Sequence, residues 1–410
     1  MTFLLLKNAL IFDGQSPDLV EGDVLVEGER IREVGRGLAT SAARALDLKG
    51  RTLMPGLIDA HFHAALVDAN LARLGHMPRS LNALHAARNL EAALDRGFTT
   101  VRDAGGADHG LARAIEAGLV KGPRLFYSGK VLSPTGGHGD ARSPEAVDCP
   151  FCPAGGNFTH IADGVDAVRK AAREELRKGA AQIKIMASGG VASPADPIWT
   201  LQYSEEEIAA AVWEAKSWRT YVMAHAYTPE AIARAVRLGV RSIEHGNLID
   251  ADTAALVTHH DAWVVPTLVT YEALDRFGRQ QGFPEVSMRK LEEVLTAGAR
   301  SLELLRAAGC RIGFGTDLLG DMHQHQSREF SIRADIQGNL ETLRQATSLN
   351  AALLERGGVL GTIAPGAVAD LVALDGDPLR DISVLEHQGA KMPLIVANGR
   401  LHRNALRETG

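Results

Sequence analysis

Apolar and polar positions follow two different patterns along this chain. Near both ends, short apolar runs separated by turn residues predict β-strands. The runs 24–26 and 30–34 flank a three-residue turn typical of a hairpin, and strand-like runs over 369–374 and 393–399 lie near the other end. Because both ends have strand patterns without helices and the middle of the chain does not, we expect the two ends to meet in one small sheet domain.

In the middle of the chain, apolar runs alternate with helical patterns. Ser204 with Glu207 forms a capping box, Thr228-Pro229 opens another helix, and 287–308 has one long helical period. Strands that alternate with helices build parallel sheets, and eight of them close a barrel. An open doubly wound sheet would need a Gly-rich phosphate turn, which the sequence lacks. The predicted strands are 53–60, 98–104, 124–129, 182–188, 221–227, 242–246, 263–268 and 312–317.

The fold class is therefore expected to be α/β, a (β/α)8 TIM barrel with a small β-sandwich domain built from both termini. We expect residues 1–55 plus 359–410 in the β-sandwich and 56–358 in the barrel. The connections 130–161 and 269–286 show no regular period and are predicted as long loops. Long loops that follow barrel strands rise from the face that carries active sites.

Composition excludes several classes of protein. The chain has 44 basic and 50 acidic residues, so charge gives no reason to expect nucleic acid or an anionic membrane as partner. No apolar run approaches the roughly 20 residues of a membrane span. Three cysteines argue against a disulfide framework. The N-terminal apolar run lacks the features of a signal peptide, so we expect a cytoplasmic protein. A signal peptide removed before residue 1 is the alternative.

Side chains that can bind metal stand at or near the ends of five predicted strands. Two imidazoles are two residues apart, so they lie on the same side of a strand. Strand ends meet over one mouth of a barrel, and histidine and carboxylate groups suit zinc and related ions. Each residue alone is also compatible with an ordinary hydrogen-bonded strand end. The six residues are His61, His63, Lys184, His225, His245 and Asp317.

Lys184 differs from the other five because an ammonium group cannot coordinate a cation. Its deprotonated amine can react with carbon dioxide, and burial beside cations lowers the pKa of a lysine. The resulting carbamate is an anionic ligand with two oxygens that can bridge two metals. The alternative is a lysine paired with an acid in the same site, and the residues alone favour neither.

The motifs, in order, resemble the metal-dependent amidohydrolase superfamily that includes imidazolonepropionase and prolidase-like Xaa-Pro and Xaa-Arg dipeptidases. The resemblance covers nearly the whole chain. The stretch 183–190 (IKIMASGG) resembles the dipeptidase and carboxypeptidase-like group, which contains amidohydrolases that degrade ochratoxin A. The other matching segments are 54–63 (MPGLIDAHFH), 224–226 (AHA), 243–246 (IEHG), 315–317 (GTD), 361–366 (GTIAPG) and 369–372 (ADLV).

This resemblance implies two divalent metal ions, with zinc expected, and a CO2-derived carbamate on Lys184. His61, His63 and Asp317 would hold the more buried ion, and His225 and His245 the more exposed one, with Lys184 bridging them. The ions would acidify a bridging water to hydroxide. Asp317 would take its proton and pass it to the leaving nitrogen. Relatives of this kind often form homo-oligomers.

In the dipeptidase relatives, a histidine and a tyrosine bind the terminal carboxylate of the substrate. They match His138, in a Gly-rich segment, and Tyr227, two residues after His225; a loop-ordering histidine and a packed tyrosine are the alternatives. We therefore expect a hydrolase that releases a C-terminal amino acid from a dipeptide, an N-acyl amino acid or ochratoxin A. The competing hypotheses are a mononuclear cyclic amidohydrolase or deaminase, and an inactive barrel that serves as a binding subunit.

Three further patterns have weaker interpretations. Cys149 and Cys152 lack a second pair, so a free or loop-bracing pair is favoured over a structural zinc site. His323-Gln324-His325 follows the last predicted strand and is interpreted as substrate contact or as a solvated loop. Arg102-Asp103 is interpreted as a pair beside the site or a salt bridge at the rim.

Overall fold

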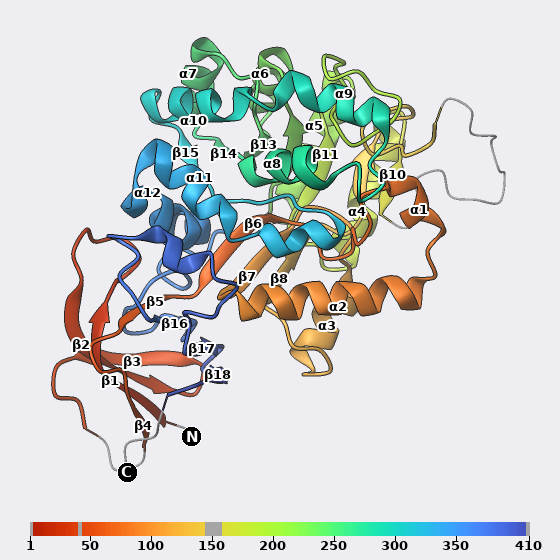
Figure 1. Ribbon diagram of the computed structural model, residues 1–410. Helices are drawn as coiled ribbons and strands as arrows, with labels where there is room; N and C mark the ends of the chain where they lie inside the picture. Colours follow the sequence, from red (N-terminus) through yellow and green to blue (C-terminus); the bar gives the residue numbers. More distant parts are fainter. Residues whose placement is uncertain (1–2, 40–42, 144–157, 407–410) are drawn as a thin grey trace.

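Strands from both ends of the chain form one sheet in the computed structural model, which describes residues 3–39, 43–143 and 158–406. The strand order is β18-β17-β16-β5-β1-β2-β3, and β4 pairs with β1. In Figure 1 the red strands of the N-terminal part lie beside the blue strands of the C-terminal part. The bounds are β1 Phe3–Ile11, β2 Val20–Glu27, β3 Arg30–Gly35, β4 Ala43–Asp47, β5 Thr52–Pro55, β16 Leu371–Leu374, β17 Leu394–Ala397 and β18 Arg400–Asn404.

The predicted hairpin and the predicted meeting of the two ends are confirmed. Strands β2 and β3 are antiparallel with Glu27 opposite Arg30, and β16 pairs with β5. Leu6 and Val24 from one end pack in the same core as Val396 from the other. Neither end buries its apolar face alone, so the small β domain depends on both. Its eight strands form a single hydrogen-bonded sheet.

The strands of the middle region pair in parallel. They form a sheet β6-β7-β8 and a sheet β10-β9-β11-β12-β13-β14-β15. The predicted strand 53–60 divides at Gly56, because β5 belongs to the terminal sheet and β6 starts the parallel strands. The bounds are β6 Leu57–Phe62, β7 Phe98–Asp103, β8 Arg124–Tyr127, β9 Val131–Ser133, β10 Thr159–Ile161, β11 Ile183–Met186, β12 Val222–Ala226, β13 Ser242–His245, β14 Trp263–Val265 and β15 Arg311–Ile312.

Helices surround the parallel strands in Figure 1. The capping box of Ser204 with Glu207 is confirmed, and so is the Thr228 cap with proline at the first helical position. No helix in the described ranges is long and apolar enough to span a membrane. The bounds are α1 Leu71–His76, α2 Arg79–Asp95, α3 His109–Glu116, α4 Val165–Arg177, α5 Glu205–Ser217, α6 Pro229–Arg237, α7 Ala251–His259, α8 Leu268–Phe277, α9 Glu285–Val294, α10 Ala297–Ala307, α11 Arg328–Gln337, α12 Asn339–Arg344 and α13 Asn350–Leu353, with η1 Gly320–His325, η2 Gln345–Leu349 and η3 Ile382–Leu385.

Three predictions for the connections were wrong. The segment 130–161 is not wholly a loop, because β9 and β10 extend the parallel sheet from it. Half of the segment 269–286 belongs to the helix α8, whose start is fixed by the Val269 N–H donating to buried Glu329 at 2.6 Å. The single predicted helix over 287–308 is divided into α9 and α10. The division lies just before Gly298, where α10 approaches α8 closely.

Candidate metal centre

All six predicted ligands and both predicted carboxylate-binding residues line one cavity. Its wall is formed by the carboxyl ends of the parallel strands, where the polar side chains of different strands meet. Five of the six ligands are buried, whereas the Asp317 side chain is 20% exposed. The eight residues are His61, His63, His138, Lys184, His225, Tyr227, His245 and Asp317.

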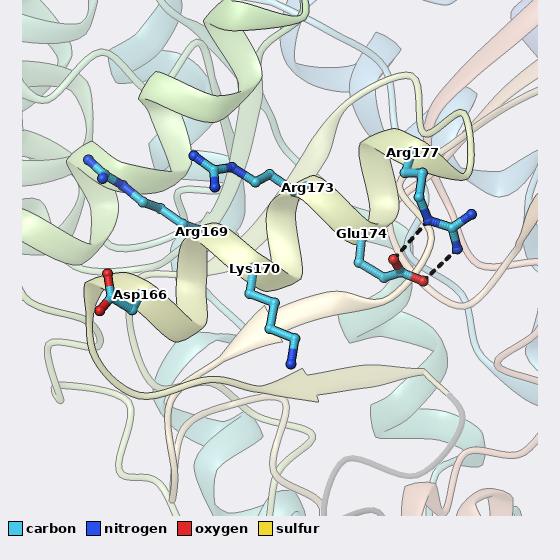
Figure 2. Close-up of a pocket in the computed structure, with 6 residues that line it drawn as sticks. All are labelled: Asp166, Arg169, Lys170, Arg173, Glu174 and Arg177. Atoms are coloured by element: carbon cyan, nitrogen blue, oxygen red, sulfur yellow. Dashed lines mark hydrogen bonds and ion pairs between the residues drawn. The ribbon is translucent and has the colours of Figure 1, made fainter.

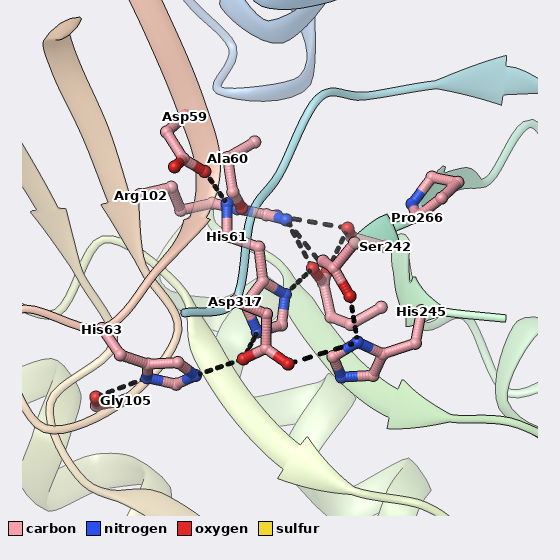
Figure 3. Close-up of polar contacts among 12 residues, drawn as sticks. Asp59, Ala60, His61, His63, Arg102, Gly105, Ser242, His245, Pro266 and Asp317 are labelled. Carbon is pink, nitrogen blue, oxygen red and sulfur yellow. Dashed lines mark hydrogen bonds and ion pairs between the residues drawn. The ribbon is translucent and has the colours of Figure 1, made fainter. Parts of the chain in front are cut away.

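Asp317 lies between three of the histidines (Figure 3). Its Oδ1 is 3.3 Å from His61 Nε2 and 3.1 Å from His63 Nε2, and its Oδ2 is 3.7 Å from His245 Nδ1. Ligand atoms of His61, His245 and Asp317 all lie within 4.8 Å of one another. This spacing allows one cation to contact all three. His63 does not belong to this set, so the predicted grouping of His61 with His63 and Asp317 stays a prediction.

Glu244 holds His61 from the side opposite Asp317. The Nδ1 of His61 is 2.6 Å from Glu244 Oε2. The Arg102 guanidinium donates to both Glu244 oxygens at 2.9 and 3.0 Å, and Ser242 Oγ donates to Oε1 at 2.6 Å. All these groups are fully buried. With Nδ1 bound to a carboxylate, His61 presents Nε2 to the cavity, as ligand histidines do.

Sequence reasoning missed Glu244 because neighbouring residues of a strand normally face opposite sides. The φ of His245 is 71°, in the left-handed region, so Glu244 and His245 both reach the interior. Of the two interpretations of Arg102-Asp103, the structure agrees with a pair beside the site, since Arg102 binds Glu244, which holds His61. Asp103 accepts the backbone N–H groups of Ala64, Gly105 and Ala107.

The protonation states of the cavity suit a cation. Burial and nearby positive charge lower the pKa of His225 well below its usual range, and burial does the same for His245 despite Asp317. Burial opposes ionisation of Asp317, but His61 and His63 hold the pKa of its carboxyl well below its usual value. His225 and His245 as neutral imidazoles and Asp317 as an ionised carboxylate are donor forms that divalent ions bind. Burial opposes protonation of His63, but its hydrogen bond to Asp317 raises the pKa of this ring.

Burial also lowers the pKa of Lys184 to about 8, with Arg102 acting in the same direction and Glu244 and Asp317 opposing it. Lys184 is only 2% exposed, so its ammonium form lacks the solvation that normally stabilises it. The acid-paired alternative predicts a direct ion pair. Within the described ranges, no carboxylate oxygen lies within 4.0 Å of its Nζ.

Polar contacts of the ring nitrogens fix the orientation of the other three ligand histidines. His63 Nδ1 is 2.9 Å from the Gly105 carbonyl oxygen, and His245 Nδ1 is 2.9 Å from Thr267 Oγ1. His225 Nε2 is 3.2 Å from the Gly189 carbonyl oxygen. The rings of His225 and His245 are 4.7 Å apart, and those of His61 and His245 are 4.8 Å apart. The imidazoles therefore form a continuous group along the cavity.

His138 and Tyr227 lie directly beside this group. The His138 ring stacks on His225 at 4.2 Å, and its Nδ1 is 3.2 Å from Asp196 Oδ2. Tyr227 packs edge-on against His225 at 4.8 Å. Its hydroxyl accepts a hydrogen bond of 2.9 Å from Tyr271, which sequence reasoning missed because it treated the segment now occupied by α8 as irregular.

His323 and His325 do not line the cavity. His323 is buried with Nε2 3.1 Å from the His63 carbonyl oxygen, so it contacts the backbone of a ligand and is neither solvated nor in the cavity. The ring of His325 stacks on Phe277 at 4.7 Å. Cys149 and Cys152 lie outside the described residues.

A second hollow of about 470 Å³ runs along α4 (Figure 2). The side chains of Arg173 and Arg177 there are 62% and 67% exposed, and they pair with Glu214 and Glu174. Exposed ion pairs of this kind form a solvated helix face. None of the predicted site residues lines it; its lining consists of Asp166, Arg169, Lys170, Arg173, Glu174 and Arg177.

Comparison with known proteins agrees with this cavity. Residues 52–400 match the Amidohydrolase family. The chain is 31% identical over 361 residues to "Ochratoxinase" of Aspergillus niger, covering 82% of this chain and 73% of the relative. A prolidase crystallised with N-methylphosphonate-L-proline is 51% identical, with a TM-score of 0.96 over 98% of this chain and 100% of that one. A Xaa-Pro dipeptidase with bound methionine is 30% identical, with a TM-score of 0.88 and the same coverage. The chain therefore belongs to the amidohydrolase family, in the group that includes prolidases and ochratoxinase, and is a hydrolytic enzyme that acts on C–N bonds.

Proposed function

We propose that this enzyme hydrolyses the amide bond between an acyl group and a C-terminal amino acid. The observation that carries the proposal is the single cavity, which holds four histidines, Lys184 and Asp317 beside His138 and Tyr227. The named activities of its relatives, prolidase, Xaa-Pro dipeptidase and ochratoxinase, support the same class of bond. The proposed substrates are dipeptides, N-acyl amino acids and ochratoxin A.

Two divalent cations, proposed to be zinc, would polarise the scissile carbonyl and make hydroxide available near neutral pH. His61, His63 and Asp317 are proposed to hold one, and His225 and His245 the other. Lys184 is proposed to bridge them as a carbamate, in which its neutral amine forms a bond to the carbon of CO2 and releases a proton. The pKa of about 8 supports this assignment, because it leaves part of the amine neutral at physiological pH.

Asp317 is proposed to transfer the proton. Its carboxylate is ionised and faces the cavity, so it can accept a proton from the attacking water and donate it to the leaving nitrogen. His138 and Tyr227 are proposed to bind the terminal carboxylate. A substrate held there lies directly beside His225, which brings its amide bond to the histidine group.

The rest of the cavity favours an apolar amino acid as leaving group. Among the described lining residues, Asp317 is the only acid, so a basic leaving side chain has no other carboxylate to pair with. An apolar lining binds apolar groups by removing their surface from water. We therefore propose proline, phenylalanine or another apolar residue; the apolar lining includes Leu66, Leu71, Val131, Phe158, Val191, Leu274 and Leu319.

We also propose that the parallel strands close into a (β/α)8 barrel formed by residues 56–358, with a β domain formed by 1–55 and 359–410. Two contacts between the separate sheets support closure. The Ala60 N–H in β6 donates to the Phe314 carbonyl just after β15, and the Ala181 N–H before β11 donates to the Tyr127 carbonyl in β8, both at 2.8 Å.

The test uses purified enzyme with N-acyl amino acids, Xaa-Pro and Xaa-Arg dipeptides and ochratoxin A, each beside its C-terminal carboxamide. We expect release of apolar amino acids, slower cleavage of the carboxamides, and nearly two metal ions per chain by elemental analysis. Opening of a lactam or cyclic imide, or deamination, with no amino acid released and one metal per chain, would support the mononuclear alternative.

A further inference from the structure

Two tyrosines from different elements meet in the cavity. Tyr271 of α8 donates its hydroxyl proton to the Tyr227 oxygen, just after β12, at 2.9 Å. Both side chains line the cavity, and each residue is 3% exposed. The hydroxyl pair is therefore part of the surface that a substrate contacts.

The Tyr227 hydroxyl uses its oxygen to accept a hydrogen bond, which leaves its proton available to donate one. A hydroxyl has one proton to donate and two lone pairs that accept. The Tyr227 oxygen accepts a hydrogen bond from the Tyr271 hydroxyl at 2.9 Å. A tyrosine hydroxyl keeps its proton at neutral pH, because its usual pKa is about 10. Because Tyr227 is the acceptor in this hydrogen bond, its own proton is available to donate.

The position of Tyr271 is itself fixed at the start of α8. The Thr267 side chain, which immediately precedes the helix, contacts the Tyr271 hydroxyl and lies 2.9 Å from Nδ1 of His245. The rings of Tyr227 and His245 are 5.4 Å apart. A chain of contacts thus connects a proposed metal ligand to the Tyr227 hydroxyl through Thr267 and Tyr271.

We propose that Tyr271 is a positioning residue that selects for anionic substrates by directing the Tyr227 proton into the cavity. This inference rests on the proposed function, in which Tyr227 contacts the terminal carboxylate. A carboxylate gains about twice as much from such a donor as a neutral carbonyl does. The hydroxyl pair therefore discriminates a free C-terminal carboxylate from its amide.

The test is Tyr271→Phe, which removes one hydroxyl and keeps the ring. We expect kcat/KM for an apolar N-acyl amino acid to fall about tenfold, mainly through KM, because one charge-assisted hydrogen bond is weakened. For the matched C-terminal carboxamide we expect a fall of about threefold, because a neutral carbonyl gains about half as much free energy from the same donor. The ratio of the two kcat/KM values is the readout, because a general loss of active protein lowers both equally.

Two further comparisons make the test specific. In a Tyr227→Phe background, Tyr271→Phe is expected to leave the ratio unchanged, because the hydroxyl it positions is absent. Tyr203→Phe is the matched control, since Tyr203 is buried and its hydroxyl has no hydrogen-bond partner among the described residues. It is expected to leave the ratio and the unfolding temperature nearly unchanged.

The outcomes separate this inference from the function on which it rests. Equal cleavage of free carboxylates and carboxamides by the unmodified enzyme would contradict the proposed carboxylate recognition. A normal preference in the unmodified enzyme that persists in Tyr271→Phe would overturn only the role of Tyr271. An equal loss on both substrates, with a lowered unfolding temperature, would assign Tyr271 a structural role and also overturn the inference.

Discussion

Two residues of the candidate metal centre have backbone conformations that side chains rarely adopt. The φ angles are 71° at His245 and 53° at Asp317, both in the left-handed region. Such conformations cost roughly 1–3 kcal/mol each and persist where surrounding contacts enforce them. At His245 the conformation turns two successive side chains toward the interior, and at Asp317 it occurs where the carboxylate faces three histidines. Local strain thus accompanies the geometry of the site.

Asp317→Asn tests the proposed proton transfer. The amide has nearly the same shape but cannot accept a proton from water, so kcat is expected to fall about 10²–10⁴-fold. Metal content, measured by elemental analysis, and the unfolding temperature identify samples in which the site is otherwise intact. Undiminished turnover in a metal-loaded, folded variant would remove Asp317 from the proton-transfer step.

Formation of the carbamate predicts a pH dependence for the metal-free protein. Only neutral lysine reacts with CO2, and the pKa of Lys184 is lowered to about 8, chiefly by burial. The neutral fraction rises from about a tenth at pH 7 to about half at pH 8, because the ratio of protonated to neutral amine falls tenfold per pH unit. Reactivation by metal at a fixed concentration of dissolved CO2 should therefore be about fivefold faster at pH 8.

The control is Lys184→Met, which should show no dependence on CO2 at either pH. The rate of regained activity after metal addition measures the effect in both proteins. A rate for the unmodified protein that is independent of CO2 would contradict the carbamate, whereas CO2 dependence without the pH effect would contradict only the lowered pKa.

The six proposed ligands could be located from the sequence because they follow apolar strand segments in a recognisable order. Their partners could not. Glu244 is placed by the unusual φ of His245, and Thr267 and Tyr271 are placed by packing of α8 over the cavity. Those positions depend on contacts between segments far apart in the chain, which local periodicity does not record.

At the scale of elements, α8 shows why a polar segment can conceal a helix. Thr270, Tyr271 and Leu274 face the cavity, while Val269, Ala273 and Phe277 border a separate hollow on the other side. Because both sides of the helix contact protein, its sequence lacks the single apolar stripe by which surface helices are recognised. The parallel strands were easier to predict, since most are short apolar runs, although β9 and β10 were missed in the segment 130–161.

Glu244 connects three of these strands, so Glu244→Gln tests a link between elements. It joins His61 of β6 and Arg102 of β7 to β13. Loss of the carboxylate that orients a ligand histidine is expected to weaken metal binding about 10–100-fold. Competition with a chelator measures that affinity. Breaking the buried pair with Arg102 should also lower stability by about 3–5 kcal/mol.

Glu175→Gln is the matched control for this variant. Glu175 is also a buried carboxylate and accepts from a histidine, His160, at 2.8 Å, but neither residue lines the cavity. Its substitution should lower stability without changing metal affinity. Equal metal affinity in Glu244→Gln and the unmodified protein would contradict the role assigned to Glu244.

At the scale of the whole molecule, the terminal sheet and the parallel strands are joined by specific contacts. Arg124 of β8 pairs with Asp370 at 2.6 Å and also contacts Asn398. The chain passes from β5 to β6 through Gly56, whose N–H donates to the Asp370 carbonyl at 2.8 Å. The sequence predicted that the termini meet, but not the division of 53–60 at this glycine, because the run is apolar on both sides of it.

Gly56→Ala tests how tightly this junction is packed. A Cβ at position 56 would lie 2.1 Å from Thr99 Oγ1 and 2.8 Å from Thr99 Cβ. Threonine is branched at Cβ and cannot move aside by a simple rotation. Overpacking of this kind costs about 1–3 kcal/mol, so the unfolding temperature in a calorimetric scan should fall. Thr99→Ala should rescue the variant in part, because it removes Oγ1, which is buried without a hydrogen-bond partner among the described residues, but keeps the Cβ. Gly75→Ala is the control, since nothing lies within 4 Å of its added Cβ. An unfolding temperature of Gly56→Ala equal to that of the control would show that the two sheets meet more loosely than this contact indicates.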